Sequence, residues 1–157
     1  MKQSFDHTHT KGFAMLFTVL IVGIILSIGI GISNITLKQT ILSSLAKDSQ
    51  TAFYQADGAI ECGLYYDITA VLFPRGVAVA SVPSILPCGN KSFALDVSAS
   101  QVNYFVYRES ISDTNNPCVI LIFDKLSSGT QTTIQSRGYN ICRVAPRQVE
   151  RILQSTY

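Results

Sequence analysis

The chain lacks histidine after His9, charge between Lys11 and Lys38, and proline before Pro74. Without a histidine beyond the leader, no Ser-His-Asp or Cys-His set can be assembled, so an enzyme is the least expected class of protein. His7 and His9 form an H-x-H pair, but in a short polar leader we expect them to be inert. The cysteines lack C-x-x-C spacing, which argues against a metal site. We therefore expect no catalytic residue, no metal and no cofactor.

Strong basic character is also missing, because 12 Lys and Arg against 10 Asp and Glu give a net charge of +2. Without a basic cluster or stripe, this balance does not indicate a nucleic-acid-binding protein. Four arginines in the last two predicted strands remain candidates for contact with DNA or an acidic partner subunit: Arg137, Arg143, Arg147 and Arg151. Pairing with local carboxylates such as Glu150 is the alternative. We expect Asp57 and Glu61, one helical turn apart, to be solvated or salt-bridged rather than catalytic.

The segment without charges between Lys11 and Lys38 contains one long apolar run. Phe13 opens twenty uncharged residues that end at Ile32, and thirteen of them are Leu, Ile, Val or Phe. Twenty helical residues span about 30 Å, the thickness of the hydrocarbon core of a bilayer. A cleaved secretory signal would have a shorter apolar region with a small-residue cleavage site close behind it. We therefore predict a retained transmembrane helix over residues 13–37.

Beyond this segment the sequence predicts one small α+β domain over residues 38–157. Apolar residues recur at three- to four-residue steps over 38–66, which indicates an amphipathic helix with one stripe packed on the rest of the domain. Residues 67–91 are broken by Pro and Gly and are expected to form a loop. Period-two alternation and one continuous apolar run over 92–157 predict a four- to five-stranded antiparallel sheet. The expected strands cover 93–97, 102–106, 118–123, 132–142 and 148–157.

Four cysteines follow the membrane segment: Cys62, Cys88, Cys118 and Cys142. They suit disulfides in an oxidising compartment, which places this domain on the extracytoplasmic side of the membrane. Four cysteines allow three pairings. A turn at 127–130 would bring Cys118 near Cys142 and leave Cys62 for Cys88, with a free buried Cys62 as the alternative. Each bridge would stabilise the domain by about 2–4 kcal/mol.

The junction Lys11-Gly12-Phe13, followed by the apolar helix and a small antiparallel sheet, resembles the type IV prepilins. The resemblance implies that residues 1–12 are a leader and that a prepilin peptidase cuts after Gly12. Phe13 would then carry a methylated N-terminal amine. The protein would be held in the inner membrane by a single helix and would join other pilin subunits in a cell-surface filament.

One position departs from the family pattern. Most pilins carry a glutamate as the fifth residue of the mature chain, where this chain has Phe17. A carboxylate at that depth costs about 2.5–3.5 kcal/mol and persists only where it pairs. In the family it pairs with the N-terminal amine of a neighbouring subunit. The chain is thus similar to PilX-like minor pilins and to the pseudopilin at a filament tip, which lack this glutamate. Its stretch 52–61 is also similar to the corresponding PilX-type stretch. A branch that lost the glutamate but remained an ordinary filament component is the alternative.

Small residues also stand four apart in the apolar helix, at Ser27 and Gly31 and at Gly29 and Ser33. Such spacing lets helices approach closely, although glycine is also simply frequent in membrane helices. We expect a minor type IV pilin or pseudopilin, a structural subunit packed through its helix. Two other hypotheses remain: a filament-tip module that binds DNA or a surface receptor, and a plain membrane-tethered domain.

Overall fold

The computed structural model describes residues 10–125 and 130–157. Helix α1 extends from Thr10 to Leu64, and a π-helical turn, Tyr65–Thr69, follows it directly. Because the first proline is Pro74, no proline interrupts the backbone hydrogen bonds of α1. Contacts divide the chain into two compact units, Met1–Ser44 and Leu45–Tyr157, and α1 contributes to both.

In the first unit, α1 presents its apolar side chains to the outside. Every large apolar side chain from Phe13 to Leu37 is exposed, from 39% at Ile21 to 75% at Phe13. The hydroxyl of Thr18 donates to the carbonyl oxygen of Met15 at 2.9 Å, so this polar group is satisfied within its own helix. By length and composition this helix is able to cross a membrane.

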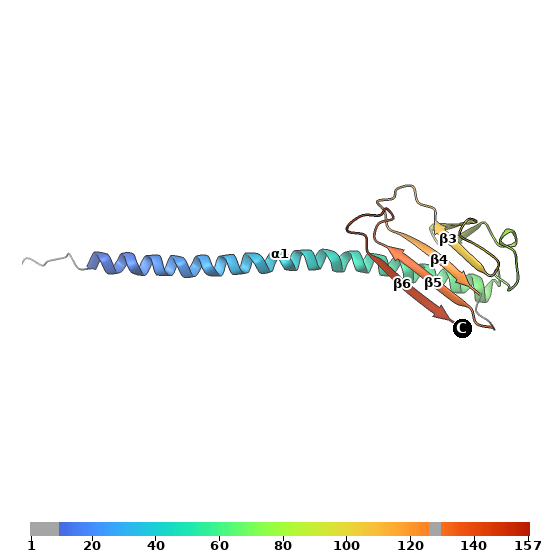
Figure 1. Ribbon diagram of the computed structural model, residues 1–157, viewed down its shortest axis with the longest axis horizontal. Helices are drawn as coiled ribbons and strands as arrows, with labels where there is room; N and C mark the ends of the chain where they lie inside the picture. The colour runs from blue at the N-terminus through green and yellow to red at the C-terminus, as the bar shows by residue number, and fades with distance from the viewer. Residues whose placement is uncertain (1–9, 126–129) are drawn as a thin grey trace, which may run out of the picture. The chain divides into compact units, whose positions relative to one another are not determined.

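The second unit combines the end of α1 with a six-stranded antiparallel sheet (Figure 1). The strands lie in the order in which they occur in the sequence, so the sheet is a simple meander. The strands are β1 Ile85–Cys88, β2 Lys91–Leu95, β3 Tyr104–Glu109, β4 Cys118–Asp124, β5 Thr133–Tyr139 and β6 Glu150–Thr156. This confirms the α+β class and the antiparallel sheet predicted from the sequence.

The sheet has six strands, however, where four or five were predicted. The additional strand is β1, which lies inside the segment 67–91 that we expected to be a loop. Pro87 suggested a break there, but β1 is an edge strand, where a residue without a backbone N–H leaves no ladder bond unmade. Pro87 is paired with Ser92 of β2. The expected turn at 127–130 lies almost wholly outside the described residues.

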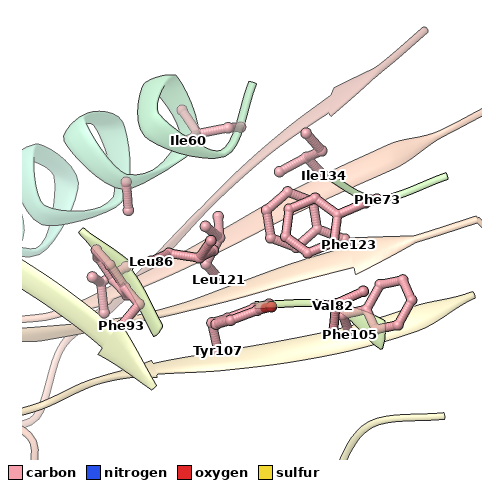
Figure 2. Packing of buried hydrophobic residues seen from close by; sticks show 12 residues of the cluster. Ile60, Phe73, Val82, Leu86, Phe93, Phe105, Tyr107, Leu121, Phe123 and Ile134 are labelled. Carbon is pink, nitrogen blue, oxygen red and sulfur yellow. The ribbon is translucent and has the colours of Figure 1, made fainter. Parts of the chain in front are cut away.

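The core lies between α1 and one face of the sheet, where large aromatic and aliphatic side chains interlock (Figure 2). Phe73, from the segment after the helix, stacks on Phe123 with ring centroids 4.1 Å apart. Tyr107 meets the ring of Phe123 edge-on at 5.9 Å, and its hydroxyl donates to the carbonyl oxygen of Pro83 at 2.6 Å. The predicted loop therefore supplies part of the core, and the polar end of Tyr107 is satisfied.

The backbone of α1 lies very close to the sheet over Gly138 of β5. A Cβ built on Gly138 would lie 2.0 Å from the carbonyl oxygen of Ala52 and 2.6 Å from the backbone nitrogen of Ala56. Ala52 and Ala56 are fully buried. Only small residues on both elements permit this packing distance, so this contact fixes where the helix lies on the sheet.

Candidate functional site

The expected processing site lies at the start of α1. Gly12 belongs to the first turns of this helix, and Phe13 is the first residue whose side chain is described. The Phe13 ring lies nearly parallel to that of Phe17, with centroids 6.5 Å apart. Phe17 therefore makes an aromatic contact and adds no charge to the apolar surface. His7 and His9 lie outside the described residues.

The small residues of the apolar helix are open to a partner. A Cβ built on Gly29 or Gly31 would meet no heavy atom within 4 Å, and Ser27 and Ser33 are exposed. Another helix could therefore approach this face closely. The chain itself supplies no such neighbour among the described residues.

The cysteines form the two bridges expected from the hairpin argument. Cys62 pairs with Cys88 and Cys118 pairs with Cys142, with Cα–Cα distances of 6.0 and 5.6 Å. The first bridge ties α1 to the end of β1. The second joins the start of β4 to the segment after β5. The two bonds thus fasten β1 to the helix and the start of β4 to the segment that precedes β6.

The four candidate arginines do not form one patch. Arg151 lies on the helix-facing side of the sheet and donates to the Ser49 hydroxyl at 2.8 and 2.6 Å. Arg137 lies on the opposite side and donates to the side-chain oxygen of Gln135 at 2.8 Å. Both of these arginines donate to neutral side chains, whereas Glu150, the carboxylate named above as an alternative partner, accepts a hydrogen bond from the Tyr139 hydroxyl at 2.9 Å. The other two candidates, Arg143 and Arg147, are exposed in the segment between β5 and β6.

Asp57 and Glu61 lie on α1 as expected from their spacing, half-buried and exposed respectively. Within residues 10–125 and 130–157, no group of three or more His, Cys, Asp or Glu is placed to hold a metal ion.

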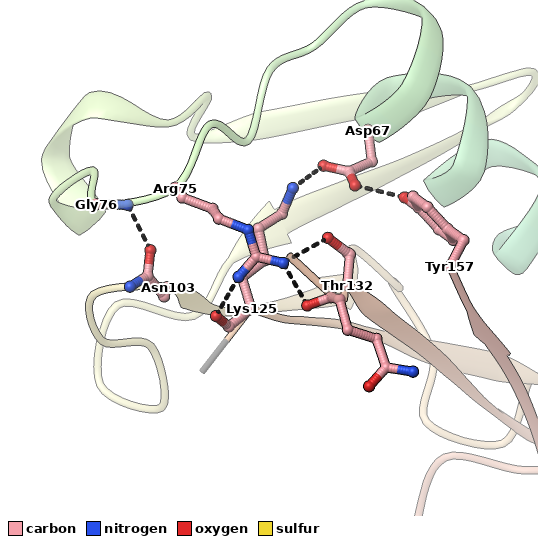
Figure 3. A network of polar contacts seen from close by, with 8 residues as sticks. Asp67, Arg75, Gly76, Asn103, Lys125, Thr132 and Tyr157 are labelled. Atoms are coloured by element: carbon pink, nitrogen blue, oxygen red, sulfur yellow. Dashed lines mark hydrogen bonds and ion pairs between the residues drawn. The ribbon is translucent and has the colours of Figure 1, made fainter. Parts of the chain in front are cut away.

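Sequence reasoning missed a buried ionic cluster at the end of the helix (Figure 3). The ammonium group of Lys125 lies 2.5 Å from a carboxylate oxygen of Asp67, and both side chains are more than nine-tenths buried. The other carboxylate oxygen of Asp67 accepts a hydrogen bond from the Tyr157 hydroxyl. The available signal was a lysine that directly follows the apolar strand 118–124, but its partner is 58 positions away in the sequence.

A second layer of polar contacts surrounds this cluster (Figure 3). Arg75 donates to the backbone carbonyl oxygens of Lys125, at 2.8 Å, and of Gln131. Asn103, in the left-handed conformation with φ 63°, accepts a bond from the N–H of Gly76 at 2.6 Å through its side chain. The backbone carbonyl oxygen of Asn103 accepts a second hydrogen bond from the N–H of Lys125 at 2.8 Å. These contacts hold together segments that are far apart in the sequence, which is a structural task.

Local contacts shift the pKa of two groups, Tyr157 in this cluster and Asp96 elsewhere in the domain. Burial, together with the hydrogen bond to Asp67, raises the pKa of the Tyr157 hydroxyl. The Ser98 hydroxyl and the Arg108 guanidinium both donate to Asp96 and lower the pKa of its carboxyl group to about 2.

Comparison of the chain with protein-family models, with characterised proteins and with solved structures gave no match.

Proposed function

We propose that the protein is a minor type IV pilin or pseudopilin, a structural subunit that enters a filament after cleavage between Gly12 and Phe13. The observation that carries the proposal is the position of the apolar part of α1. It opens directly after Lys11-Gly12, and the same helix ends in a small disulfide-bonded sheet domain. This is the arrangement that the resemblance to prepilins implies.

The apolar helix has two uses in this proposal. In the membrane, its thirteen Leu, Ile, Val and Phe residues supply about 4–8 kcal/mol of insertion free energy before the polar residues subtract. In a filament, the same exposed side chains need other apolar helices around them, because a surface of this extent is not stable in water. Gly29 and Gly31 leave room for such helices to approach.

Phe17 supports a minor rather than a major role. Without a carboxylate at this position, the subunit cannot form the ion pair with the N-terminal amine of a neighbouring subunit that the family uses. We therefore place it where no further subunit has to be recruited in this way, as at a filament tip. Before assembly, the domain from residue 38 onward would lie on the extracytoplasmic side of the inner membrane.

The test is the intact mass of the chain produced with and without a prepilin peptidase. We expect a product that begins at Phe13 and carries one additional methyl group, formed only when the peptidase is present. Gly12→Arg should leave the leader attached and abolish filament incorporation. Gly58→Arg adds the same charge at an exposed helical position and should be processed normally.

A full-length product under both conditions would refute the proposal and leave a membrane-tethered domain. The exposure of Arg143 and Arg147 favours one further candidate, a tip module that binds DNA. It requires DNA binding that weakens with salt and is lost when both arginines are neutralised. Binding that does not respond to salt, or no binding, would exclude it.

A further inference from the structure

A groove between α1 and the β1–β2 hairpin has no part in the function proposed above. It consists of two adjoining hollows with volumes of about 210 and 440 Å³, and Gly58 and Cys88 line both of them. A Cβ built on Gly58 would meet no heavy atom within 4 Å, so the groove is open at its middle. The Cys62–Cys88 disulfide holds the hairpin to the helix and thus fixes the width of the groove.

Tyrosine rings form the walls of this groove. Tyr54 lines the smaller hollow, and Tyr65 and Tyr66 line the larger one together with Pro87. Tyr54 and Tyr65 are 69% and 57% exposed. Tyr66 is held in place, because its hydroxyl donates to the carbonyl oxygen of Pro87 at 2.6 Å and its ring meets that of Tyr65 edge-on. Exposed aromatic rings on a rigid support are typical of binding surfaces.

The charge at the groove is negative. Glu61 lines the larger hollow and is exposed, and Asp57 lies one helical turn before it. Lys91 lines the smaller hollow, but its ammonium group lies 2.9 Å from a carboxylate oxygen of Glu109 and also donates to Gln55. Because this positive charge is already compensated, Glu61 is left to attract a cation.

The chemistry of the lining matches a particular kind of ligand. Proline rings pack on exposed aromatic side chains, and a polyproline II helix is preformed, so such a peptide loses little conformational entropy on binding. We propose that this groove binds an extended, proline-rich peptide segment that carries Lys or Arg, with prolines in the two hollows and the basic side chain at Glu61. Asn90, which lines the smaller hollow, can donate to the free carbonyl groups of such a peptide.

The test uses the oxidised full chain in detergent micelles and a synthetic peptide, Arg-Pro-Leu-Pro-Pro-Leu-Pro, followed by amide chemical shifts in NMR titrations. We expect shifts confined to the groove, around Tyr54, Gly58 and Tyr65. A peptide with Gly in place of Pro should bind at least about tenfold more weakly, because it loses the preformed conformation. A peptide with Glu in place of Arg should also bind more weakly.

Variants separate this site from other parts of the surface. Tyr65→Ala should weaken binding about tenfold, the effect of removing one aromatic anchor. Glu61→Gln should weaken it about threefold and reduce its salt dependence. Gly58→Gln should block the groove and leave the fold intact, because open space surrounds Gly58 and Gln favours helix. Tyr104→Ala, on the opposite face of the sheet, should change nothing.

The proposal does not depend on cleavage of the leader or on filament assembly. It would be overturned by the absence of shifts at millimolar peptide, by shifts that map elsewhere, or by equal binding of the Gly-containing peptide. Unchanged binding by a folded Gly58→Gln variant would overturn it too.

Discussion

Gly138→Ala tests the packing argument most directly. The added Cβ would lie 2.0 Å from the Ala52 carbonyl oxygen and 2.6 Å from the Ala56 nitrogen. Both contacts are to backbone atoms of α1, so no side-chain rotation can relieve them. The helix would have to move away from β5 by about 1 Å, and such a gap forfeits a quarter to a half of the dispersion energy of the separated atoms.

The expected loss of stability combines two terms. Overpacking a well-packed core costs about 1–3 kcal/mol and sometimes more, and contacts with backbone belong at the upper end of that range. Replacing Gly by Ala within a strand also stabilises the fold by about 0.5–1 kcal/mol, because Ala loses less backbone entropy on folding. We therefore expect the free energy of unfolding to fall by about 2–3 kcal/mol. For a domain of this size, the melting temperature would fall by roughly 10 °C.

The assay is urea unfolding of the oxidised full chain in mild detergent, followed by near-ultraviolet circular dichroism of the tyrosines. Two glycines of α1 complete a graded series with Gly138 of β5. Gly63→Ala meets only the Leu121 and Ile134 side chains, at 3.1 and 3.2 Å, and should have a small effect. Gly58→Ala meets nothing and should stabilise the domain by about 0.5–1 kcal/mol. If Gly138→Ala unfolds within 0.5 kcal/mol of the parent chain, the packing argument is refuted.

Three further predictions concern the second unit. Lys125→Met should destabilise it by about 3–5 kcal/mol in the same urea assay, because the buried Asp67 is left without its counter-ion. Lys125→Met combined with Asp67→Leu should cost less than the single change, and an equal or larger cost would contradict this account. Replacing Cys62 and Cys88 by Ser should cost about 3.5 kcal/mol, as calculated from the sequence separation of 26 residues, and hydrogen exchange should quicken first in β1 and β2; uniform quickening would argue against a local role. Because the folded-state pKa of Asp96 is lowered to about 2, its contribution to stability is complete above about pH 4 and is lost as the pH falls from 4 to 2. Asp96→Asn should flatten the pH dependence of the free energy of unfolding in this window, and an unchanged slope would exclude the contribution.

Local patterns in the sequence predicted most of the secondary structure. The period-two residues around Phe93 and Val106 lie in β2 and β3, and the apolar run 118–123 forms β4 in the middle of the sheet. β1 was missed because its four residues include Pro87 and are too few for an alternating pattern to be recognised. The outer ends of two predicted strands, Val97 and Val102, are exposed and lie outside the strands, because the chain turns between them.

The candidate sites, too, could be predicted from the sequence only in part. Spacing alone led to the pairing of Cys118 with Cys142, because a hairpin brings the ends of adjacent strands together. Spacing could not show that Arg137 and Arg151 point to opposite faces of the sheet, because that depends on the register of β5 and β6. It also could not show the groove at Gly58, whose second wall comes from a hairpin about 30 residues further along the chain.

The sequence by itself determined the properties that depend on neighbouring residues: the apolar helix, the junction at Gly12, the α+β class and the period of the strands. Helix and membrane propensities are set within a few turns of the chain, so a local pattern is enough to predict them. Only the tertiary structure decided that Asp67 lies against Lys125, that Gly138 admits the backbone of α1, and that Tyr66 lies against the β1–β2 hairpin. These contacts join residues far apart in the sequence, and their geometry follows from strand register and helix placement, which no local pattern determines.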